Sequence, residues 1–260
     1  MMHYEKYYLT CNKRRDILVP AASKVFGIMI MTASEFKQAR KQKRMTQCAV
    51  AKLLSVSQPY VALLEKGKRT FPDALARRAV VRLEMNPLSL PVAERKGPFS
   101  AQNLAQQLAS LGYPGFASMR SAWKRNPVQV LLEALAQDNL EARLTEALPW
   151  VLTNYAEMSH ANRSWLAEQA RLRNLTNRLG FVVTLARQVL AGKGETGSER
   201  YHSLGLLESE LKESRLEKED TLCQSLSKAE EEWLRASRPQ EAAFWNLLTD
   251  WRPEHLQYAG

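Results

Sequence analysis

Apolar and polar residues follow a helical period along almost the whole chain after residue 31. Apolar positions recur three or four residues apart, as on one face of an α-helix, and no stretch alternates strictly enough to predict a β-strand. Short breaks rich in Gly, Pro and Ser separate the helical stretches. The pattern therefore predicts an all-α protein.

Residues 32–86 contain four helical stretches with clear start and stop signals. Thr32 and Glu35 have the spacing of a capping box, and Thr46 and Ser57 each offer a hydroxyl to free backbone N–H groups at a helix start. Gly67 suits the left-handed residue that ends many helices. The expected helices cover residues 32–44, 46–54, 57–66 and 72–85.

The second and third of these helices are joined by a very short turn at Ser55 and Val56. Val50 and Leu54 face inward at helical spacing on one side of this turn, and the apolar stripe continues on the other side. Two helices joined in this way, with the start of the second exposed, have the geometry that places a helix in the major groove of DNA. We therefore expect a helix-turn-helix within residues 32–86.

A proline-rich segment separates this region from the rest of the chain. Residues 87–99 contain three prolines and Gly97, and we interpret them as an extended linker between two domains. Residues 100–260 are expected to form a helical bundle domain, with capping boxes that begin at Asp138 and Ser227 and a candidate helix break at Gly180. Its expected helices cover residues 100–111, 127–137, 139–153, 160–191, 200–223, 228–236 and 239–250.

Residues 1–31 precede the first clear helix. Three basic residues at positions 13–15 come before an apolar run from Ile17 to Met31, which is the order found in a signal peptide. The run is interrupted by Lys24 and is too short to cross a bilayer. We interpret this segment as a poorly ordered extension, or as sequence upstream of a true start at Met29 or Met31, and expect no membrane association.

The formal net charge of +10 is concentrated in the first 100 residues. They contain 19 Lys and Arg against 7 Asp and Glu, whereas residues 101–260 contain 18 against 20. A basic region followed by a nearly neutral one indicates that only the first contacts a polyanion. Nucleic acid is the favoured partner, and a ribosomal or membrane-surface contact is the alternative.

Cysteines and histidines do not form a metal-binding pattern. Cys11, Cys48 and Cys223 lie far apart, and the four histidines are scattered. Neither a zinc site nor a disulfide framework is expected, and this composition fits a reducing, cytoplasmic setting. The second half also lacks an HExxH motif or another catalytic pattern. We therefore expect no enzyme activity, no metal and no cofactor.

More than a dozen positions between residues 46 and 69 share a register with one known family of DNA-binding domains. They are Thr46, Gln47, Val50, Ala51, Leu54, Val56, Ser57, Gln58, Val61, Leu64, Glu65, Gly67, Lys68 and Arg69. With them, residues 32–86 resemble the Cro/lambda-repressor type of helix-turn-helix, the XRE family of bacterial and phage regulators. The resemblance implies a transcriptional regulator, in the first place a repressor, that binds a two-fold operator in double-stranded DNA as a homodimer.

The resemblance also implies a role for each polar residue on this surface. Gln47, at the start of the second helix, would clamp a phosphate, and Gln58, at the start of the third, would read adenine with its amide. Tyr60 would reach a phosphate or the groove wall. The basic residues before the second helix and after the third would lie along the DNA backbone: Lys43, Arg44, Lys66, Lys68 and Arg69.

Arg40 and Glu65 match the positions of the family's internal ion pair, which braces the first helix against the third. The chain departs from the family at Ser55, where glycine is usual in the turn, so that a left-handed conformation there costs about 1 kcal/mol. Three recognition-helix positions that are commonly polar have apolar side chains, which leaves few hydrogen bonds for direct reading but allows contact with thymine methyls. They are Pro59, Ala62 and Leu63.

Residues 100–260 are expected to dimerise, to sense a ligand or to bind a partner protein. All six tryptophans lie there, and we expect them in the core, with an exposed aromatic cage as the alternative. Leu204, Leu207 and Leu211 with several glutamates predict an acidic amphipathic helix, either a partner-facing or dimerising segment or the solvated outside of the bundle. An alternative function is an antitoxin whose second half neutralises a toxin while the first half represses its own operon.

Overall fold

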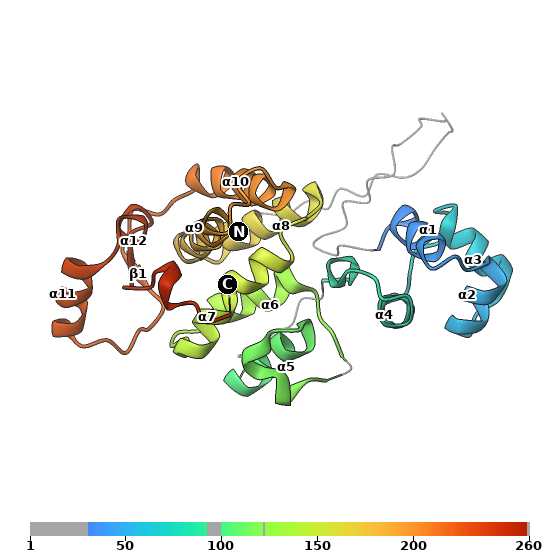
Figure 1. The fold of residues 1–260 in the computed structure, drawn as a ribbon, viewed down its shortest axis with the longest axis horizontal. Helices are drawn as coiled ribbons and strands as arrows, with labels where there is room; N and C mark the ends of the chain where they lie inside the picture. Colours follow the sequence, from blue (N-terminus) through green and yellow to red (C-terminus); the bar gives the residue numbers. More distant parts are fainter. Residues whose placement is uncertain (1–30, 93–99, 122, 259–260) are drawn as a thin grey trace, which may run out of the picture.

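The computed structural model describes residues 31–92, 100–121 and 123–258. Over these residues the protein is mostly helical, which confirms the predicted all-α class. The helices form two lobes in Figure 1, an N-terminal lobe of α1 to α4 and a larger C-terminal lobe of α5 to α12. The extension predicted over residues 1–31 lies outside the described residues except for Met31, which is buried in the N-terminal core.

The N-terminal lobe is built from four short helices, and side-chain caps fix the starts of the first three. Thr32 and Glu35 form the predicted capping box, and the hydroxyls of Thr46 and Ser57 accept the expected backbone N–H groups. The apolar faces of all four helices meet in one core around Phe36. The helices are α1 (Ala33–Gln42), α2 (Gln47–Leu54), α3 (Gln58–Glu65) and α4 (Asp73–Arg82).

Residues 87–92, the first part of the predicted linker, are packed between the two lobes, and the remainder of that linker, residues 93–99, lies outside the described residues. Pro87–Ser89 is a short 3-10 turn, η1. Leu88 and Val92 are buried in the C-terminal core, whereas Leu90 is buried in the N-terminal core. The buried Asn126 donates hydrogen bonds to the backbone oxygens of Leu88 (3.0 Å) and Leu90 (2.8 Å). Proline content suggested a spacer, but the leucines and valine between the prolines bury enough apolar surface to join the lobes.

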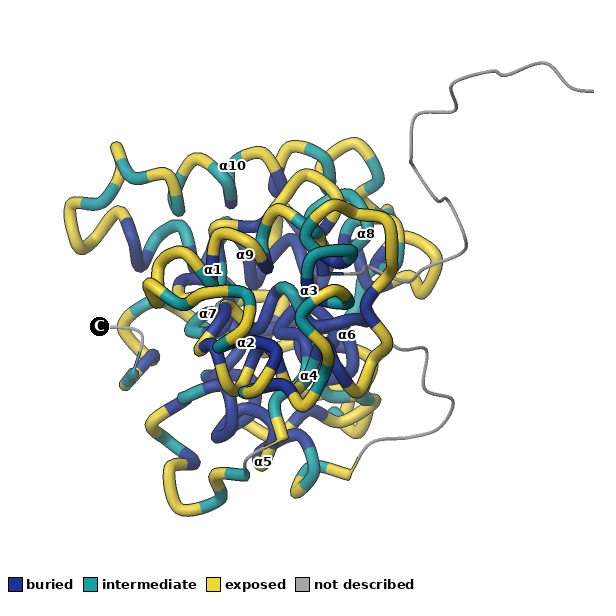
Figure 2. Tube along the Cα trace, turned by 90° about the vertical axis from the view of Figure 1, so that its right-hand side faces the viewer, coloured by how far each residue is buried: buried dark blue, intermediate teal, exposed yellow. Residues whose placement is uncertain are grey.

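The C-terminal lobe surrounds two buried helices. All nine residues of α6 are buried, and α9 packs against α7, α8 and α10. Figure 2, in which the N-terminal lobe faces the viewer, shows buried residues around α6 and exposed ones along the outside of α10. The helices of this lobe are α5 (Ala101–Leu111), α6 (Pro127–Leu135), α7 (Ala142–Asn154), α8 (His160–Leu172), α9 (Thr176–Gly192), α10 (Glu199–Lys212), α11 (Lys228–Ser237) and α12 (Gln240–Phe244), with 3-10 turns η2 (Pro114–Met119) and η3 (Pro253–His255).

Several helix ends in this lobe differ from the sequence-based expectation. The stretch expected at 160–191 is divided between α8 and α9, where Asn174 is left-handed, and Gly180 lies inside α9. The box expected at Asp138 is absent, because α7 begins only after Glu141. The predicted helix 200–223 ends at Lys212. A two-residue parallel strand pair, β1 (Asp220–Thr221) and β2 (Leu247–Leu248), occupies sequence that was expected to be helical.

Gly180 has a packing role. A Cβ atom at this position would lie only 2.4–2.5 Å from three ring atoms of Trp245, which is fully buried. The missing side chain therefore lets the indole lie directly on α9, and the indole Nε1 donates to Thr184 (2.9 Å). Trp150, Trp165 and Trp251 also pack against the core, as predicted for the tryptophans, whereas Trp123 and Trp233 are exposed.

The acidic helix α10 lies on the outside of the bundle. Leu204, Leu207 and Leu211 are buried, and the helix packs on α9 and α8. This packing favours the second of the two interpretations of this segment, because the leucine face that would have formed a dimer is already used within the chain.

Candidate nucleic-acid interface

In the turn between α2 and α3, Ser55 has the left-handed conformation for which glycine is usual. Its φ and ψ angles are 55° and 49°, and its N–H bonds to the carbonyl of Lys52. Val56 then bonds to the carbonyl of Ala51 (2.9 Å) and packs against the N-terminal core. A non-glycine residue in this conformation costs about 1 kcal/mol, which the buried contacts of α2 and α3 offset.

A chain of hydrogen bonds runs from the core of the lobe to the first residue of α3. Arg40 on α1 forms a bidentate pair with Glu65 at the end of α3, with distances of 2.5 and 3.0 Å. The second carboxylate oxygen also accepts from the amide of Gln47 (2.9 Å). Gln47 in turn accepts from the amide of Gln58 (2.8 Å). The two glutamines proposed from sequence are therefore in contact, and both are linked to the ion pair assigned to the fold.

The Glu65 carboxylate is the anchor of this chain. Its side chain is 3% exposed, and burial alone would raise its pKa. Hydrogen bonds from Arg40 and Gln47, with the charges of Arg40 and Lys37, outweigh that penalty and lower the pKa. Arg40 also donates to the backbone oxygen of Met45 (2.8 Å), which fixes the segment that leads into α2. The ionised pair thus holds three elements together.

The remaining residues predicted for this surface lie around the start and end of α3. Pro59 is exposed, whereas Tyr60 and Leu63 are half-buried, and Tyr60 packs against the core. Gly67 is left-handed, with a φ of 67°, and redirects the chain after the helix. The basic residues on either side of it are exposed: Lys66, Lys68 and Arg69.

Lys43 and Arg44, which were expected to lie along the DNA backbone, are both exposed between α1 and α2. Lys43 pairs with Glu84, which follows α4, and the two side chains are 39% and 76% exposed. Such an exposed pair contributes about 0–1 kcal/mol, so a phosphate can displace the carboxylate. Arg44 has a positive φ of 51° and its side chain is exposed.

The electrostatics of this surface favour an anion. Residues 31–92 contain 12 Lys and Arg against 4 Asp and Glu. Neither α2 nor α3 has an acidic residue in its first turn. At the start of each helix, no first-turn carboxylate therefore neutralises the free N–H groups and the positive end of the helix dipole. This is the arrangement that binds phosphates.

A comparison with protein families gives a match to the helix-turn-helix family over residues 36–83. Residues 36–83 are a helix-turn-helix domain of the Cro/C1 type. This helix-turn-helix domain supports the assignment of the chain as a DNA-binding transcriptional regulator of the XRE type, with double-stranded DNA as its partner. Comparisons with curated proteins and with solved structures give no match.

Outside the helix-turn-helix domain, the described residues present no metal-binding group. No cluster of three or more His, Cys, Asp and Glu side chains is placed to hold an ion in this part of the chain. Among the same residues, no helix has the length and apolarity needed to cross a membrane. Cys48, which is exposed on α2, and the half-buried Cys223 are both free thiols.

The sequence did not reveal that the two glutamines and the ion pair form one connected unit. Gln47 and Gln58 could be placed at helix starts, because helix periodicity and caps are local signals. Their mutual hydrogen bond depends on the angle between α2 and α3, which the left-handed Ser55 and the packing of Val56 set. The sequence feature that could have indicated this hydrogen bond is that Gln47 and Gln58 each follow a hydroxyl N-cap residue by one position.

Proposed function

We propose that the protein is a sequence-specific repressor that reads a two-fold operator as a dimer, with Gln58 as its principal base-reading residue. The observation that supports this proposal is the hydrogen-bond chain that ends at Gln58, because it fixes a side chain that would otherwise rotate freely. Holding a recognition side chain in place before binding lowers the entropy lost on binding.

The hydrogen-bonding groups that Gln47 and Gln58 leave unused match groups on DNA. An amide side chain has two N–H donors and one carbonyl acceptor. Gln58 uses one N–H on Gln47, which leaves one donor and one acceptor, the pair that adenine requires in the major groove. Gln47 uses one N–H on Glu65 and keeps a second for a backbone phosphate. Gln47 would therefore bind the phosphate and hold the Gln58 amide in position at the same time.

The other predicted residues supply affinity and shape. Lys66, Lys68 and Arg69 beyond α3, with Arg44 and a displaced Lys43, are expected to neutralise phosphates. Pro59, Tyr60 and Leu63 contribute apolar contacts in the groove, so part of the selectivity would come from thymine methyls and DNA shape. A dimer that covers a promoter would exclude other proteins from it, which is the simplest route to repression.

Two substitutions separate base reading from phosphate binding. We expect Gln58→Ala to lose about 1–3 kcal/mol of discrimination at one base pair, because an amide that fits adenine is removed. Lys68→Ala should weaken binding to all sequences alike and reduce the slope of log K against log salt by about one. Selected operator and random DNA can be compared by fluorescence anisotropy over a salt series. Equal effects of both substitutions on both DNAs would rule out reading by Gln58.

The proposed homodimer is a separate prediction. A single lobe of this size makes few base contacts, and joining two half-sites raises affinity through effective concentration. We expect a dimer at micromolar concentration in sedimentation velocity, with one dimer bound per operator. A monomer in both the free and the DNA-bound sample would contradict this part of the proposal and leave DNA binding itself intact.

A second candidate is an antitoxin-type regulator, which is favoured by exposed aromatic side chains on the C-terminal lobe. Trp233 on α11 is 58% exposed and Phe244 on α12 is 44% exposed. Exposed aromatic side chains are common in protein interfaces. Co-expression with the neighbouring reading frame tests this: relief of its toxicity, lost in Trp233→Ala, would support it, and unchanged toxicity would exclude it.

A further inference from the structure

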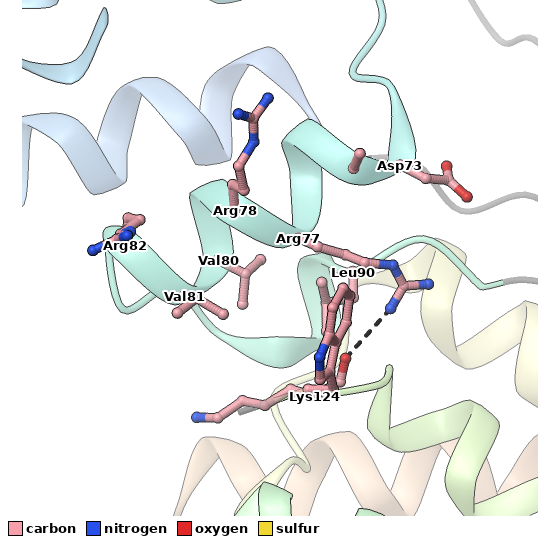
Figure 3. A pocket seen from close by; sticks show the side chains of 10 residues that line it. Asp73, Arg77, Arg78, Val80, Val81, Arg82, Leu90 and Lys124 are labelled. Carbon is pink, nitrogen blue, oxygen red and sulfur yellow. Dashed lines mark hydrogen bonds between the residues drawn. The ribbon is translucent and has the colours of Figure 1, made fainter. Parts of the chain in front are cut away.

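An apolar cleft lies between the two lobes, on the side of α4 that faces away from the helix-turn-helix core. Its volume is about 660 Å³, and one wall is α4 while the other is the segment at Trp123 and Lys124 that leads into α6. Figure 3 shows Val80 and Val81 above this space and Lys124 below it, with Arg77 joined to the backbone of Lys124. That hydrogen bond, at 3.4 Å, is a polar link across the cleft.

Large apolar side chains on this surface are exposed to an unusual degree. Trp123 is 69% exposed and Val81 is 49% exposed, and both line the cleft. Val80 and Leu90 form its floor and are themselves part of the buried N-terminal core. A tryptophan and a valine left in water beside an apolar floor indicate a surface that a ligand covers.

The charges around the cleft are of one sign. Arg77, Arg78, Arg82 and Lys124 line it, against a single carboxylate, Asp73. Within the described residues, none of these four cations forms an ion pair with a carboxylate. In Figure 3, Arg82 and Lys124 extend toward the Val81 side, and Arg77 lies at the other side. The rim therefore offers unpaired positive charge beside an apolar floor.

We propose that this cleft binds a small organic anion with an apolar or aromatic body. The volume falls within the roughly 300–1,000 Å³ range of sites for small organic ligands. The apolar body would lie on Val81, Leu90 and the indole of Trp123, and the acidic group would face Arg82 and Lys124. Removing the valine and the indole from water supplies affinity, while the cations select for a carboxylate or sulfonate over a neutral analogue.

The ligand would contact both lobes at once. Val80 and Leu90 belong to the same core as α2 and α3, whereas Lys124 directly precedes the segment that begins α6. A bound ligand would therefore contact core residues of the helix-turn-helix domain and a residue of the C-terminal lobe at the same time. The site itself does not rest on the proposed operator reading, and its test uses no DNA.

The test compares two dyes with similar aromatic bodies and different charge. Anilinonaphthalene sulfonate carries an anionic group, and phenylnaphthylamine lacks it. With the full-length protein we expect one saturable sulfonate site per chain and binding of the neutral dye weaker by about tenfold or more. Val81→Asp, at an exposed position of α4, should weaken sulfonate binding by at least about tenfold, because it places a carboxylate in the cleft. Leu206→Asp, at a 55% exposed position on α10, is the matched control and should bind normally.

Four results would overturn the proposal. Equal binding of the two dyes would remove the role of the cations. Unchanged binding of the sulfonate dye in Val81→Asp would place the dye elsewhere. If the variant does lose dye binding, its circular dichroism spectrum excludes misfolding as the cause. A sedimentation shift from dimer to monomer in Val81→Asp, without a lost dye site, would show that a second copy of the chain covers the cleft. Tight binding of an acidic peptide that displaces the sulfonate dye, with no small anion able to do so, would assign the surface to a protein partner.

Discussion

The two lobes use buried ion pairs in opposite ways. In the C-terminal lobe, Arg178 places its guanidinium on Asp220 at 2.8 and 2.9 Å and on the backbone oxygens of Leu135 and Gln137, both at 2.9 Å. All of these partners belong to the lobe itself. In the N-terminal lobe, the Arg40–Glu65 pair continues through Gln47 to Gln58, whose amide retains a free donor and acceptor at the surface.

This difference separates stability from recognition. A polar network that is closed can only stabilise the fold, because each donor and acceptor already has a partner. A network that ends in unsatisfied groups on the surface can bind a ligand with side chains already in position. The N-terminal lobe therefore has an open network on the surface that we propose to face DNA, whereas the Arg178 network of the C-terminal lobe ends within that lobe.

The largest expected effect comes from breaking the closed network. Asp220→Ala leaves the Arg178 guanidinium, whose side chain is 7% exposed, without its carboxylate. Removing one partner of a buried pair costs about 3–5 kcal/mol, and the 19% exposure of Asp220 places the expected loss near the lower end. Urea unfolding should show this loss, whereas the folded fraction should bind DNA as the unaltered protein does. Lost DNA affinity in the folded variant would show that the Arg178 network of the C-terminal lobe also supports the DNA-binding surface of the N-terminal lobe.

A smaller effect is expected at Gly180, which lies against Trp245. Gly180→Ala forces a methyl group into the indole, so we expect a loss of about 1–3 kcal/mol from overpacking. The matched control is Gly192→Ala at the end of the same helix, where a Cβ would meet nothing within 4 Å. The control should be neutral or slightly stabilising in the same urea titration. Equal stability of the two variants would show that the indole moves aside freely.

The smallest expected effect concerns acid. Burial raises the pKa of Glu65 and of Glu208, but hydrogen bonds and charges from Arg40, or from Arg187 and Lys212, lower both below the ordinary value of 4.5. A carboxyl with a lowered pKa stabilises the fold above its unfolded pKa, and this contribution is lost as the pH falls through the folded one. We therefore expect both lobes to lose stability below about pH 4.5.

Two isosteric substitutions assign this acid sensitivity to each lobe. Glu65→Gln should flatten the acid dependence of the N-terminal lobe, and Glu208→Gln that of the C-terminal lobe. Unfolding followed by amide hydrogen exchange from about pH 6 to pH 3 reports the lobes separately. An unchanged pH profile in either variant would show that other carboxyls dominate the titration.

Local signals predicted much of the N-terminal lobe. Thr32, Thr46 and Ser57 cap the expected helices, because capping depends on residues three positions apart. The same reasoning located the cap at Ser227. The proposed DNA-facing residues could be named from the register of this segment, whereas the hydrogen bond between Gln47 and Gln58 depends on how two helices cross.

Non-local contacts explain the errors in the C-terminal lobe. Gly180 was a candidate helix break, but its partner, Trp245, lies 65 residues further along the chain. The expected helix 200–223 stops early partly because the buried Asn177 binds the backbone of Leu216 through both its amide oxygen and nitrogen. Neither contact leaves a periodic trace in the sequence, so patterns within one segment could not predict them.

The packed segment at residues 87–92 determines how the protein can be cut into pieces. A fragment that ends at residue 86 loses Leu90 from the N-terminal core, and one that ends at residue 92 carries Leu88 and Val92 into water without their C-terminal partners. Each uncovered side chain costs about 1.5–3 kcal/mol, enough to matter for a lobe of about 60 residues. No cut within this segment leaves both cores complete. A helix-turn-helix fragment designed at the family boundary would therefore be less stable than the same residues in the whole chain.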